Sequence, residues 1–370
     1  MLNQKMLTIN EINKLKIVFI VGRGRSGTSL LQTIFDANPC VKTANESPFI
    51  LHLKQKYSRV KNWNNDKINE FIIDLYKDKK FTFLWGINPD DIKQNINLYS
   101  QSDLSFPVLC KLVYLTISSP FPKEKTRLIV DKNPLYSPFT SDLIEVFPNA
   151  KFIHLIRDYR DNINSSRKTF KLKNIIVLAH KWKRYNKTVD KQKEKYPTQF
   201  YTIRYEDLVT EPKKHIPEIC AFLNISFDQQ MSEFYNTTRE AYTDKTYKNG
   251  IMAELVQQIH SNLLNPITTS QIDKWKIELS TNEIELIEYI TGEYAKKYNY
   301  YPSTHNTKFY FVFISWKNYF KDQFSHLVYK TYYKLPFKVR DLLRLISDKL
   351  FDKLGYSNAY NEVSVRYRNK

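Results

Sequence analysis

A short segment near the start of the chain places the strongest constraint on the fold. Lys16–Gly22 reads KIVFIVG, a β-branched apolar run that is typical of a buried parallel strand. The run ends at a glycine-rich turn, and Thr28–Ala37 then has the pattern of a helix that Asn38-Pro39 closes. The chain has 7 glycines, and three of them, at positions 22, 24 and 27, fall within six positions. A strand, a glycine-rich turn and a helix in this order predict a loop that binds an anion at the helix N-terminus.

Further strands alternate with helices along the chain. Buried strands are predicted at Arg127–Val130 and Lys151–Arg157, and Gln199–Arg204 alternates like another strand. Helices are predicted at residues 158–169, 174–194 and 212–223. This alternation predicts an α/β fold of the P-loop type, with a doubly wound, mainly parallel sheet flanked by helices. Ligands are expected at the carboxyl ends of the strands.

The chain is predicted to consist of a main domain and an extension. Residues 1–303 are expected to form the domain, and within it residues 54–125 show no helical periodicity beyond a helix near Lys67–Tyr76. Residues 304–370 are expected to form a basic, aromatic-rich helical extension. Its helical spacing is clearest in Phe309–Phe320 and Tyr332–Leu354.

The cysteines and the N-terminal segment favour a reducing compartment. Cys40, Cys110 and Cys220 are far apart and form no CxxC spacing, so neither a disulfide framework nor a thiolate metal site is predicted. The N-terminal segment lacks the apolar core and cleavage site of a signal peptide, and no segment approaches the roughly 20 apolar residues of a membrane span. These features predict a cytoplasmic protein, and they leave open a peripheral contact with the inner face of the membrane.

The charge of the chain is strongly positive and unevenly distributed. The formal net charge is +19, and residues 305–370 hold thirteen basic against five acidic residues. Such a balance is typical of proteins that bind nucleic acid, an anionic membrane surface or small polyanions. Genome base composition explains the overall charge equally well, but it explains the clustering less well. No nucleic-acid-binding module is recognised in the sequence, so nucleic acid is not the expected partner.

The glycine-rich loop almost matches the nucleotide-binding pattern G-x-x-x-x-G-K-[ST]. Thr28 replaces the lysine that would reach the β- and γ-phosphates of a nucleoside triphosphate, which argues against ATP or GTP chemistry. The candidate ligands of the loop are Arg23, Gly24, Arg25, Ser26, Gly27, Thr28 and Ser29. A tight turn without a ligand would not need these cationic and hydroxyl side chains. The set suits a donor with one 5′-phosphate that carries a transferable group.

A second phosphate site is predicted at the end of the strand Lys151–Arg157. Arg157 lies at the strand's carboxyl end, and Ser165 lies two turns into the following helix. Such a pair can hold one phosphate from both sides. The alternative is an ordinary helix start, in which Asp158 and Asp161 favour the N-terminal turn.

The chain resembles PAPS-dependent sulfotransferases at four places, in the order of that family. The loop resembles the family's 5′-phosphosulfate loop, and Arg157 with Ser165 resembles its 3′-phosphate site. Tyr205-Glu206-Asp207-Leu208 resembles its Y-E-D-L segment, in which the tyrosine lies near the adenine. Lys274-Trp275 belongs to a stretch similar to the late W-K segment, which closes over the nucleotide.

Within the family, the tyrosylprotein and carbohydrate branches are the nearer likeness. The stretches that carry it are Arg25–Pro39, Asp131-Lys132-Asn133-Pro134 and residues 147–152. The resemblance implies that Glu46 is the general base, that Arg25 neutralises the leaving oxygen and that Lys132 contacts the sulfuryl group. It also implies PAPS as the donor, 3′,5′-ADP as the product and no requirement for a metal ion.

Each of these site assignments has a simpler alternative. Glu46 could be a surface carboxylate at a helix start, and Lys132 could be an exposed lysine after a strand. His154 lies inside an apolar strand and is expected to be a core residue. His52 lies near Glu46 in the sequence and could line the acceptor site.

The identity of the acceptor is the part that the sequence determines least. The lack of a signal anchor and of paired cysteines favours a lipid, sterol or glycan hydroxyl over a protein tyrosine. The extension could lie on an anionic membrane, cap the active site or form an oligomer interface, and packing is slightly favoured because aromatic residues at helical spacing usually pack. A P-loop small-molecule kinase is the alternative function for the whole chain.

Overall fold

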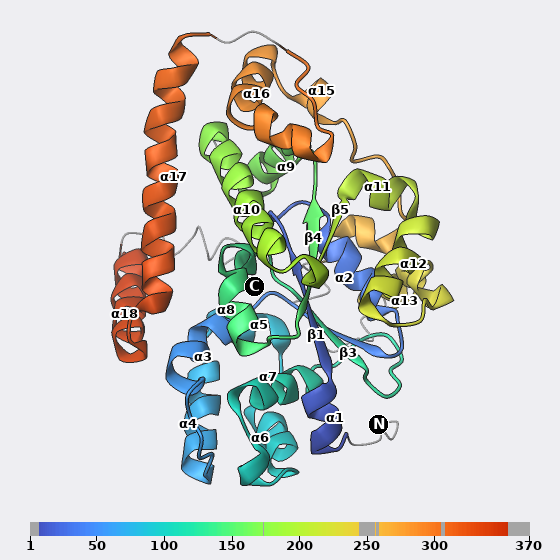
Figure 1. Ribbon diagram of the computed structural model, residues 1–370, viewed down its shortest axis with the longest axis vertical. Coiled ribbons are helices and arrows are strands. Elements are labelled where there is room, and N and C mark those ends of the chain that lie inside the picture. Colours follow the sequence, from blue (N-terminus) through green and yellow to red (C-terminus); the bar gives the residue numbers. More distant parts are fainter. Residues whose placement is uncertain (1–6, 173, 244–255, 257–258, 305–307, 354–370) are drawn as a thin grey trace.

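The protein is built around a five-stranded sheet. The computed structural model describes residues 7–172, 174–243, 256, 259–304 and 308–353. All neighbouring strands are parallel, in the order β2-β3-β1-β4-β5 (Figure 1). The strands are β1 (Lys16–Val21), β2 (Val41–Ala44), β3 (Leu128–Lys132), β4 (Lys151–Ile156) and β5 (Phe200–Arg204). The predicted P-loop-type doubly wound fold is confirmed, with a sheet that is parallel throughout.

Helices cover both faces of the sheet. The side chains of β1 therefore alternate between two different cores. Phe19 packs into one core, whereas Val18 and Ile20 pack into the other. Helices of the first core are α1 (Ile9–Lys14), α3 (Phe49–Tyr57), α4 (Asn65–Leu75), α5 (Lys79–Trp85), α6 (Pro89–Asn97), α7 (Phe106–Leu115) and α8 (Thr140–Val146). Helices of the second core are α2 (Thr28–Asp36), α11 (Tyr205–Thr210), α12 (Pro212–Leu223) and α13 (Phe234–Thr243). A third core unites α9 (Tyr159–Phe170), α10 (Ile175–Lys195), α15 (Trp275–Glu278) and α16 (Thr281–Ala295).

Residues 54–125 contain the predicted helix near Lys67–Tyr76, as α4, and three further helices that no periodicity had indicated. Four helices, α4 to α7, lie within this segment, and α3 enters it. Helix α7 escaped notice because eight of its ten residues are buried, so it has no polar face to create a periodic pattern. Strand β2 was also missed, because four residues that include Lys42 and Thr43 do not form a recognisable apolar run.

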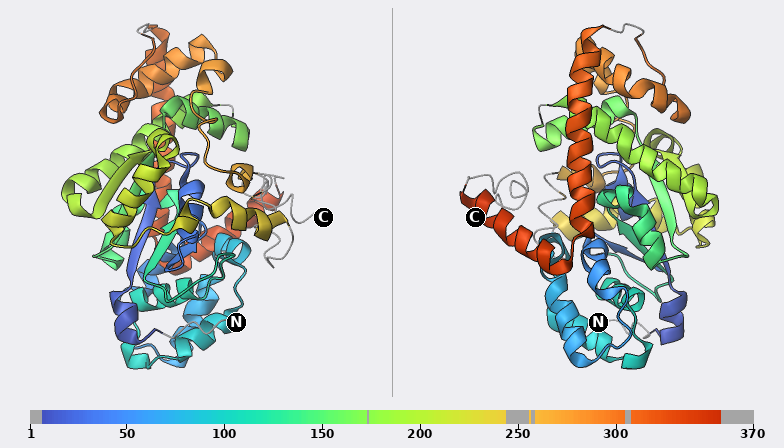
Figure 2. Two further views of the ribbon diagram at one scale, coloured as in Figure 1. Left: turned by 90° about the vertical axis from the view of Figure 1, so that its right-hand side faces the viewer. Right: turned by 60° about the vertical axis from the view of Figure 1, so that its left-hand side comes forward.

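Between residues 308 and 353, the described part of the extension, two helices pack on the domain. Helix α17 (Tyr310–Lys334) lies along α10, and α18 (Phe337–Lys353) leaves its end at a sharp angle (Figures 1 and 2). Asp322 of α17 is fully buried and accepts hydrogen bonds of 2.8 and 2.9 Å from the Arg184 guanidinium of α10. Arg340 of α18 donates to the His52 carbonyl at 2.8 Å. In the described part of the chain, no helix is long and apolar enough to cross a membrane.

Candidate functional site

The turn after β1 can be formed only by glycine at position 22. Gly22 has a φ of 137°, and a Cβ atom there would lie 2.2 Å from the Leu155 carbonyl oxygen of β4. The Ser137 hydroxyl accepts from the Gly22 N–H and donates to its carbonyl, both at 2.8 Å. These contacts fix the direction in which the chain leaves β1 and turns at the carboxyl ends of the strands.

The loop then presents an open, uncapped helix start. Gly27, with a φ of 89°, is the N-cap of α2, and no side chain caps this helix. A Cβ atom added at Gly24 would have its nearest neighbour 4.0 Å away, so space is open beside this residue. The Asn162 amide holds the loop by donating to the Gly24 carbonyl at 2.9 Å and to the Ser26 hydroxyl at 3.0 Å. Free backbone N–H groups at a helix N-terminus make this an anion-binding position.

Two arginine side chains converge on the loop. Arg25 Nε donates to the Ser165 hydroxyl at 3.2 Å, and Arg157 Nη1 donates to the Arg25 carbonyl at 3.1 Å. Burial, and then the positive charge of Arg157, lower the pKa of Arg25. Arg157 Nε is buried without a hydrogen-bond partner among the described residues. Two close guanidinium groups with unused donor capacity are suited to bind an anion.

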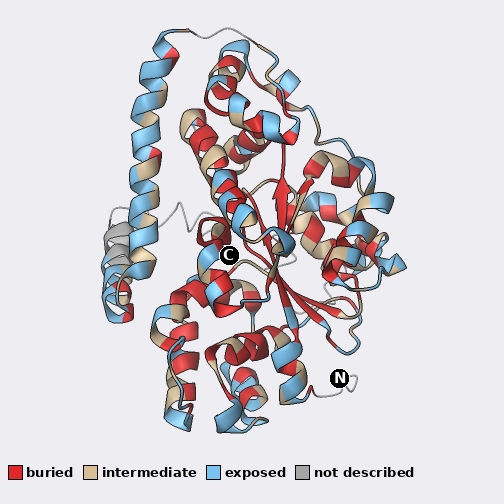
Figure 3. Cartoon of the chain, in the orientation of Figure 1, coloured by how far each residue is buried: buried red, intermediate tan, exposed pale blue. Residues whose placement is uncertain are grey.

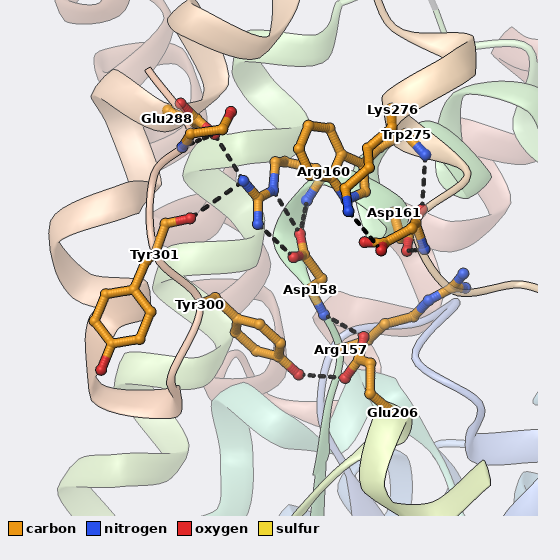
Figure 4. A network of polar contacts seen from close by, with 12 residues as sticks. Arg157, Asp158, Arg160, Asp161, Glu206, Trp275, Lys276, Glu288, Tyr300 and Tyr301 are labelled. Atoms are coloured by element: carbon orange, nitrogen blue, oxygen red, sulfur yellow. Dashed lines mark hydrogen bonds and ion pairs between the residues drawn. The ribbon is translucent and has the colours of Figure 1, made fainter. Parts of the chain in front are cut away.

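A polar network holds Arg157 and the end of β4 in place (Figure 4). The Glu206 carboxylate accepts from the Asp158 N–H at 3.0 Å and from the Tyr300 hydroxyl at 2.5 Å. The Arg160 guanidinium forms ion pairs of 2.7 Å with both Asp158 and Glu288. These contacts join the start of α9 to α11, α16 and the residues after α16. The side chain of Arg157 thus projects from a rigid base.

The predicted Y-E-D-L and W-K segments lie next to this base. Tyr205 lies directly after β5, its ring faces Gly27, and the Arg157 guanidinium lies 4.8 Å from the ring centre. Asp161 accepts from the backbone N–H groups of Asp273 and Trp275, at 2.9 and 3.0 Å. The Trp275 ring is buried beneath the Arg160 guanidinium, 3.9 Å from the ring centre.

The W-K segment contacts Arg157 through its backbone. The Gln271 carbonyl accepts from Arg157 Nη2 at 2.5 Å. Lys274 is the N-cap residue of α15 and is partly buried. The segment therefore packs against the Arg157 guanidinium through its main chain, while the Trp275 ring supports Arg160.

A second charged cluster lies at the ends of β2 and β3. Lys132 ends β3, and its Nζ atom lies 3.0 Å from Glu46, which follows β2 by two residues. Lys80 of α5 lies 3.3 Å from the other oxygen of the same carboxylate. Burial by itself raises the pKa of Glu46, but the charges and hydrogen bonds of Lys132 and Lys80 outweigh it and lower the pKa to about 2. The Glu46 carboxylate is therefore ionised and shared between two lysines.

Neighbouring contacts fix this cluster in place. The Gln32 amide of α2 donates to the Ala44 carbonyl at 3.1 Å, and the Trp85 indole of α5 donates to the Asn45 carbonyl at 3.1 Å. Behind Lys132, the fully buried Asp131 accepts a hydrogen bond from the Tyr114 hydroxyl. Burial raises the pKa of Asp131 well above its usual value.

Two predicted ligands of the loop, Arg23 and Ser26, already contact other side chains. The Arg23 guanidinium lies 5.3 Å from the Tyr185 ring centre on α10, and the Ser26 hydroxyl is buried against Asn162. Thr28 is buried at the first position of α2, and Ser29 beside it is partly buried.

The two histidines considered from the sequence are both buried. His154 is fully buried and hydrogen-bonded to Asn186 at 2.9 Å, as expected of a core residue. The His52 ring is buried and covered by Phe337 of α18, with ring centres 5.1 Å apart, so it faces the extension rather than open space.

Sequence reasoning missed two residues of the charged cluster. Lys80 lies on one of the helices that had no visible periodicity. Burial, and then the charges of Lys132 and Arg25, lower the pKa of His260 to about 3, so this histidine is neutral within electrostatic range of both cations. Neither residue belongs to a motif that would have identified it. Within the described residues, no group of three or more His, Cys, Asp or Glu side chains could hold a metal ion.

The parallel sheet, the glycine-rich turn at the start of α2 and the nearby arginines define an α/β protein with a loop of the kind that can bind an anion. The chain belongs to the sulfotransferase family, whose sequence model matches residues 18–229. The matched region contains the loop, Glu46, Lys132, Arg157 and Tyr205.

Individual relatives are distant. A protein-tyrosine sulfotransferase of Drosophila melanogaster is 24% identical over 74% of this chain and 49% of its own length. An omega-hydroxy-beta-dihydromenaquinone-9 sulfotransferase of Mycobacterium tuberculosis is 22% identical over 56% of this chain and 62% of its own. The chain thus spans about half to three fifths of these relatives. Among solved structures, the sulfotransferase domain of the Synechococcus PCC 7002 olefin synthase is 20% identical, with 75% of this chain and 95% of that domain covered and a TM-score of 0.47.

Proposed function

We propose that this protein transfers a sulfuryl group from PAPS to an acceptor hydroxyl. The observation that carries the proposal is the approach of Arg25 and Arg157 at the uncapped start of α2. A buried and a partly buried arginine beside free N–H groups form a site that an anion completes. Membership of the sulfotransferase family supports PAPS as that anion.

The residues fit a donor with two separate phosphate groups. The loop around Gly24 has open space for the 5′-phosphosulfate, and Ser165 with Arg157 can receive the 3′-phosphate. The unpartnered Nε atom of Arg157 is a donor still available for that contact. Tyr205 lies beside Arg157, where its ring can meet the adenine. Bound there, the donor supplies a sulfuryl group that is activated by its bond to a phosphate.

In this proposal, Glu46 accepts the proton of the attacking hydroxyl. The acceptor oxygen forms a bond to sulfur while the bond from sulfur to the bridging phosphate oxygen breaks, and its electron pair leaves with 3′,5′-ADP. Arg25 offsets the negative charge that grows on that leaving oxygen. Lys132 is held by Glu46 and would turn to the sulfuryl oxygens, which frees the carboxylate and raises its basicity.

The acceptor that we propose is a hydroxyl of a lipid, sterol or glycan rather than a protein tyrosine. The relatives named above include one named for a protein tyrosine and one named for a hydroxylated menaquinone, so family likeness alone supports either. An exposed apolar surface on α17, described below, favours a lipid-borne hydroxyl. Turnover of labelled PAPS with sterols, glycolipids and tyrosine peptides would test this choice, and transfer to the peptides alone would contradict it.

Calorimetry tests the donor assignment. We expect 3′,5′-ADP to bind and Mg-ATP not to bind, whereas tight binding of Mg-ATP alone would favour the small-molecule kinase. Arg157→Ala should reduce the affinity for 3′,5′-ADP by about tenfold to a hundredfold, since a hydrogen bond to a charged group is worth about 1.5–3 kcal/mol. Arg59→Ala removes an exposed arginine outside the site and should change nothing. Equal affinities of the two variants would overturn the assignment.

A further inference from the structure

Helix α17 exposes a continuous apolar stripe. The stripe consists of Phe309, Phe313, Trp316, Phe320, Phe324 and Leu327, which follow one another at spacings of three or four residues. Such spacing places all six on one face of the helix, over a length of about 27 Å. Their exposed fractions range from 54% to 80%. Figure 3 shows this helix mostly in the colour of exposed residues.

The stripe is not the face that packs on the domain. The packed face lies opposite and includes Phe311, which is 1% exposed, and Asp322, which is fully buried. The Ser315 carbonyl lies 3.1 Å from the His180 ring nitrogen of α10, and Tyr329 contacts Phe139 with ring centres 5.4 Å apart. Helix α17 therefore packs on α10 and its neighbours through one face, and the apolar stripe on the opposite face stays exposed.

Lysines flank the stripe on both sides. Lys317 and Lys321 lie beside its first half, and Lys330 and Lys334 lie on the opposite flank of its second half. The only acidic residue of α17 is Asp322, whose charge is paired with Arg184 on the packed face. The outward side of the helix is thus apolar along its centre, and the charged residues along its edges are all lysines.

We propose that the α17 stripe docks the protein on an anionic lipid bilayer, with the helix lying parallel to the membrane surface. Aromatic side chains between lysines are typical of interfacial helices, because the rings enter the boundary of the acyl chains while the lysines contact anionic headgroups. Trp316 lies near the middle of the stripe, and tryptophan favours this boundary.

A second copy of the chain fits the stripe less well. Pairing two α17 stripes would bring lysine flanks together without an exposed carboxylate on either helix to neutralise them. An anionic bilayer supplies that complementary charge. The apolar row of α18 (Val339, Leu342, Leu343 and Ile346) is also exposed, which adds surface of the same kind.

The intrinsic tryptophans allow a direct test with the unmodified full chain. Of the 5 tryptophans, Trp63, Trp85, Trp182 and Trp275 are at most 5% exposed, whereas Trp316 is 67% exposed. Vesicles of phosphatidylcholine with phosphatidylserine should shift the emission to shorter wavelength and carry the protein upward in a flotation gradient. Vesicles of phosphatidylcholine alone should do so more weakly, and added salt should weaken binding. No shift and no flotation would overturn the proposal.

Matched variants distinguish membrane binding through the stripe from nonspecific hydrophobic adsorption. Trp316→Ser with Phe320→Ser should lower vesicle partitioning by more than about tenfold, because two large apolar side chains no longer enter the bilayer. Ile73→Ser with Leu98→Ser removes two exposed apolar residues elsewhere and should leave partitioning unchanged. An equal loss of vesicle partitioning in both double variants would contradict the proposal. So would a wild-type protein that does not bind vesicles but forms a dimer that the first pair of substitutions dissociates. Binding of 3′,5′-ADP by all variants reports on folding and tests the donor site separately.

Discussion

The two halves of the candidate site are held in different ways. The donor half, formed by the loop with Arg157 and Ser165, is fixed by backbone groups: Ser137 holds both polar atoms of Gly22, and Arg157 donates to two carbonyls. The acceptor half, formed by Glu46, Lys80 and Lys132, is held by charges that satisfy one another. In the proposed mechanism, the first half receives the donor as it stands. In the second half, Lys132 must leave Glu46 before the carboxylate takes a proton.

The largest expected effect tests the rigidity of the donor half. Gly22→Ala places a methyl group against the Leu155 carbonyl at an unfavourable φ, so we expect a loss of stability on the order of 3 kcal/mol or more, measured by urea unfolding. Gly24→Ala is the matched variant, because its methyl group enters open space. It should leave the free energy of unfolding unchanged and weaken 3′,5′-ADP binding by about tenfold. If Gly24→Ala bound the nucleotide normally, the open space would not be the donor cradle.

The next effect separates the two halves by function. Glu46→Gln should reduce turnover by about 10²–10⁴-fold, because the amide cannot accept the proton, while calorimetric affinity for 3′,5′-ADP stays unchanged. Glu293→Gln, at a carboxylate whose side chain is 84% exposed, should leave both quantities unchanged. A parallel loss of turnover and nucleotide affinity in Glu46→Gln would show that the halves are not separate.

The ion pairs of the acceptor half should also affect the pH dependence of turnover. Lys80 contributes to the low pKa of Glu46, so Lys80→Met should raise that pKa from about 2. The acidic limb of the profile of kcat/KM against pH should move upward by about one pH unit, since activity needs the ionised carboxylate. Lys93→Met, at an exposed residue of α6, should leave the profile in place. An unchanged acidic limb in Lys80→Met would remove Lys80 from the cluster's electrostatics.

The smallest effect concerns Asp131 behind Lys132. Its raised pKa means that the folded state binds a proton more tightly than the unfolded state, so its contribution to stability is complete below the unfolded pKa, about 4, and is lost as pH rises through the folded value. Asp131→Asn keeps an acceptor for Tyr114 and should flatten the fall of Tm with rising pH. Thermal melts across that range check this, and an unaltered slope would contradict it.

The proximity of the loop, Arg157 and Ser165 could be predicted from the sequence, because its signals are local. The glycines at 22, 24 and 27 lie within one turn, and Arg157 and Ser165 are close in the chain, so spacing alone brings them near a strand end. The strand ends of a parallel sheet then meet at one edge, which places Arg157 beside the loop. The roles of these residues remain predictions until ligand binding is measured.

The acceptor half was harder to predict, because its partners come from distant segments. Lys80 reaches Glu46 from α5, a seven-residue helix that is too short for periodicity to identify. The donor loop also holds exceptions: Arg23 and Ser26 carry side chains of the right kind, yet the first lies over Tyr185 and the second is buried against Asn162. Composition can suggest a ligand, but only the three-dimensional fold determines which way a side chain points.

The ion pair between Asp322 and Arg184 has a consequence for where the folding unit ends. A chain shortened at residue 304 would leave Arg184 without its carboxylate and would uncover Phe139, which Tyr329 and Tyr333 now cover. Removing α17 and α18 would therefore disturb α10. The effect would reach the glycine-rich loop, because the Arg23 guanidinium lies over the Tyr185 ring of α10. The function of α17 is therefore to be tested by point substitutions on its exposed face rather than by truncation, because its packed face covers part of the domain.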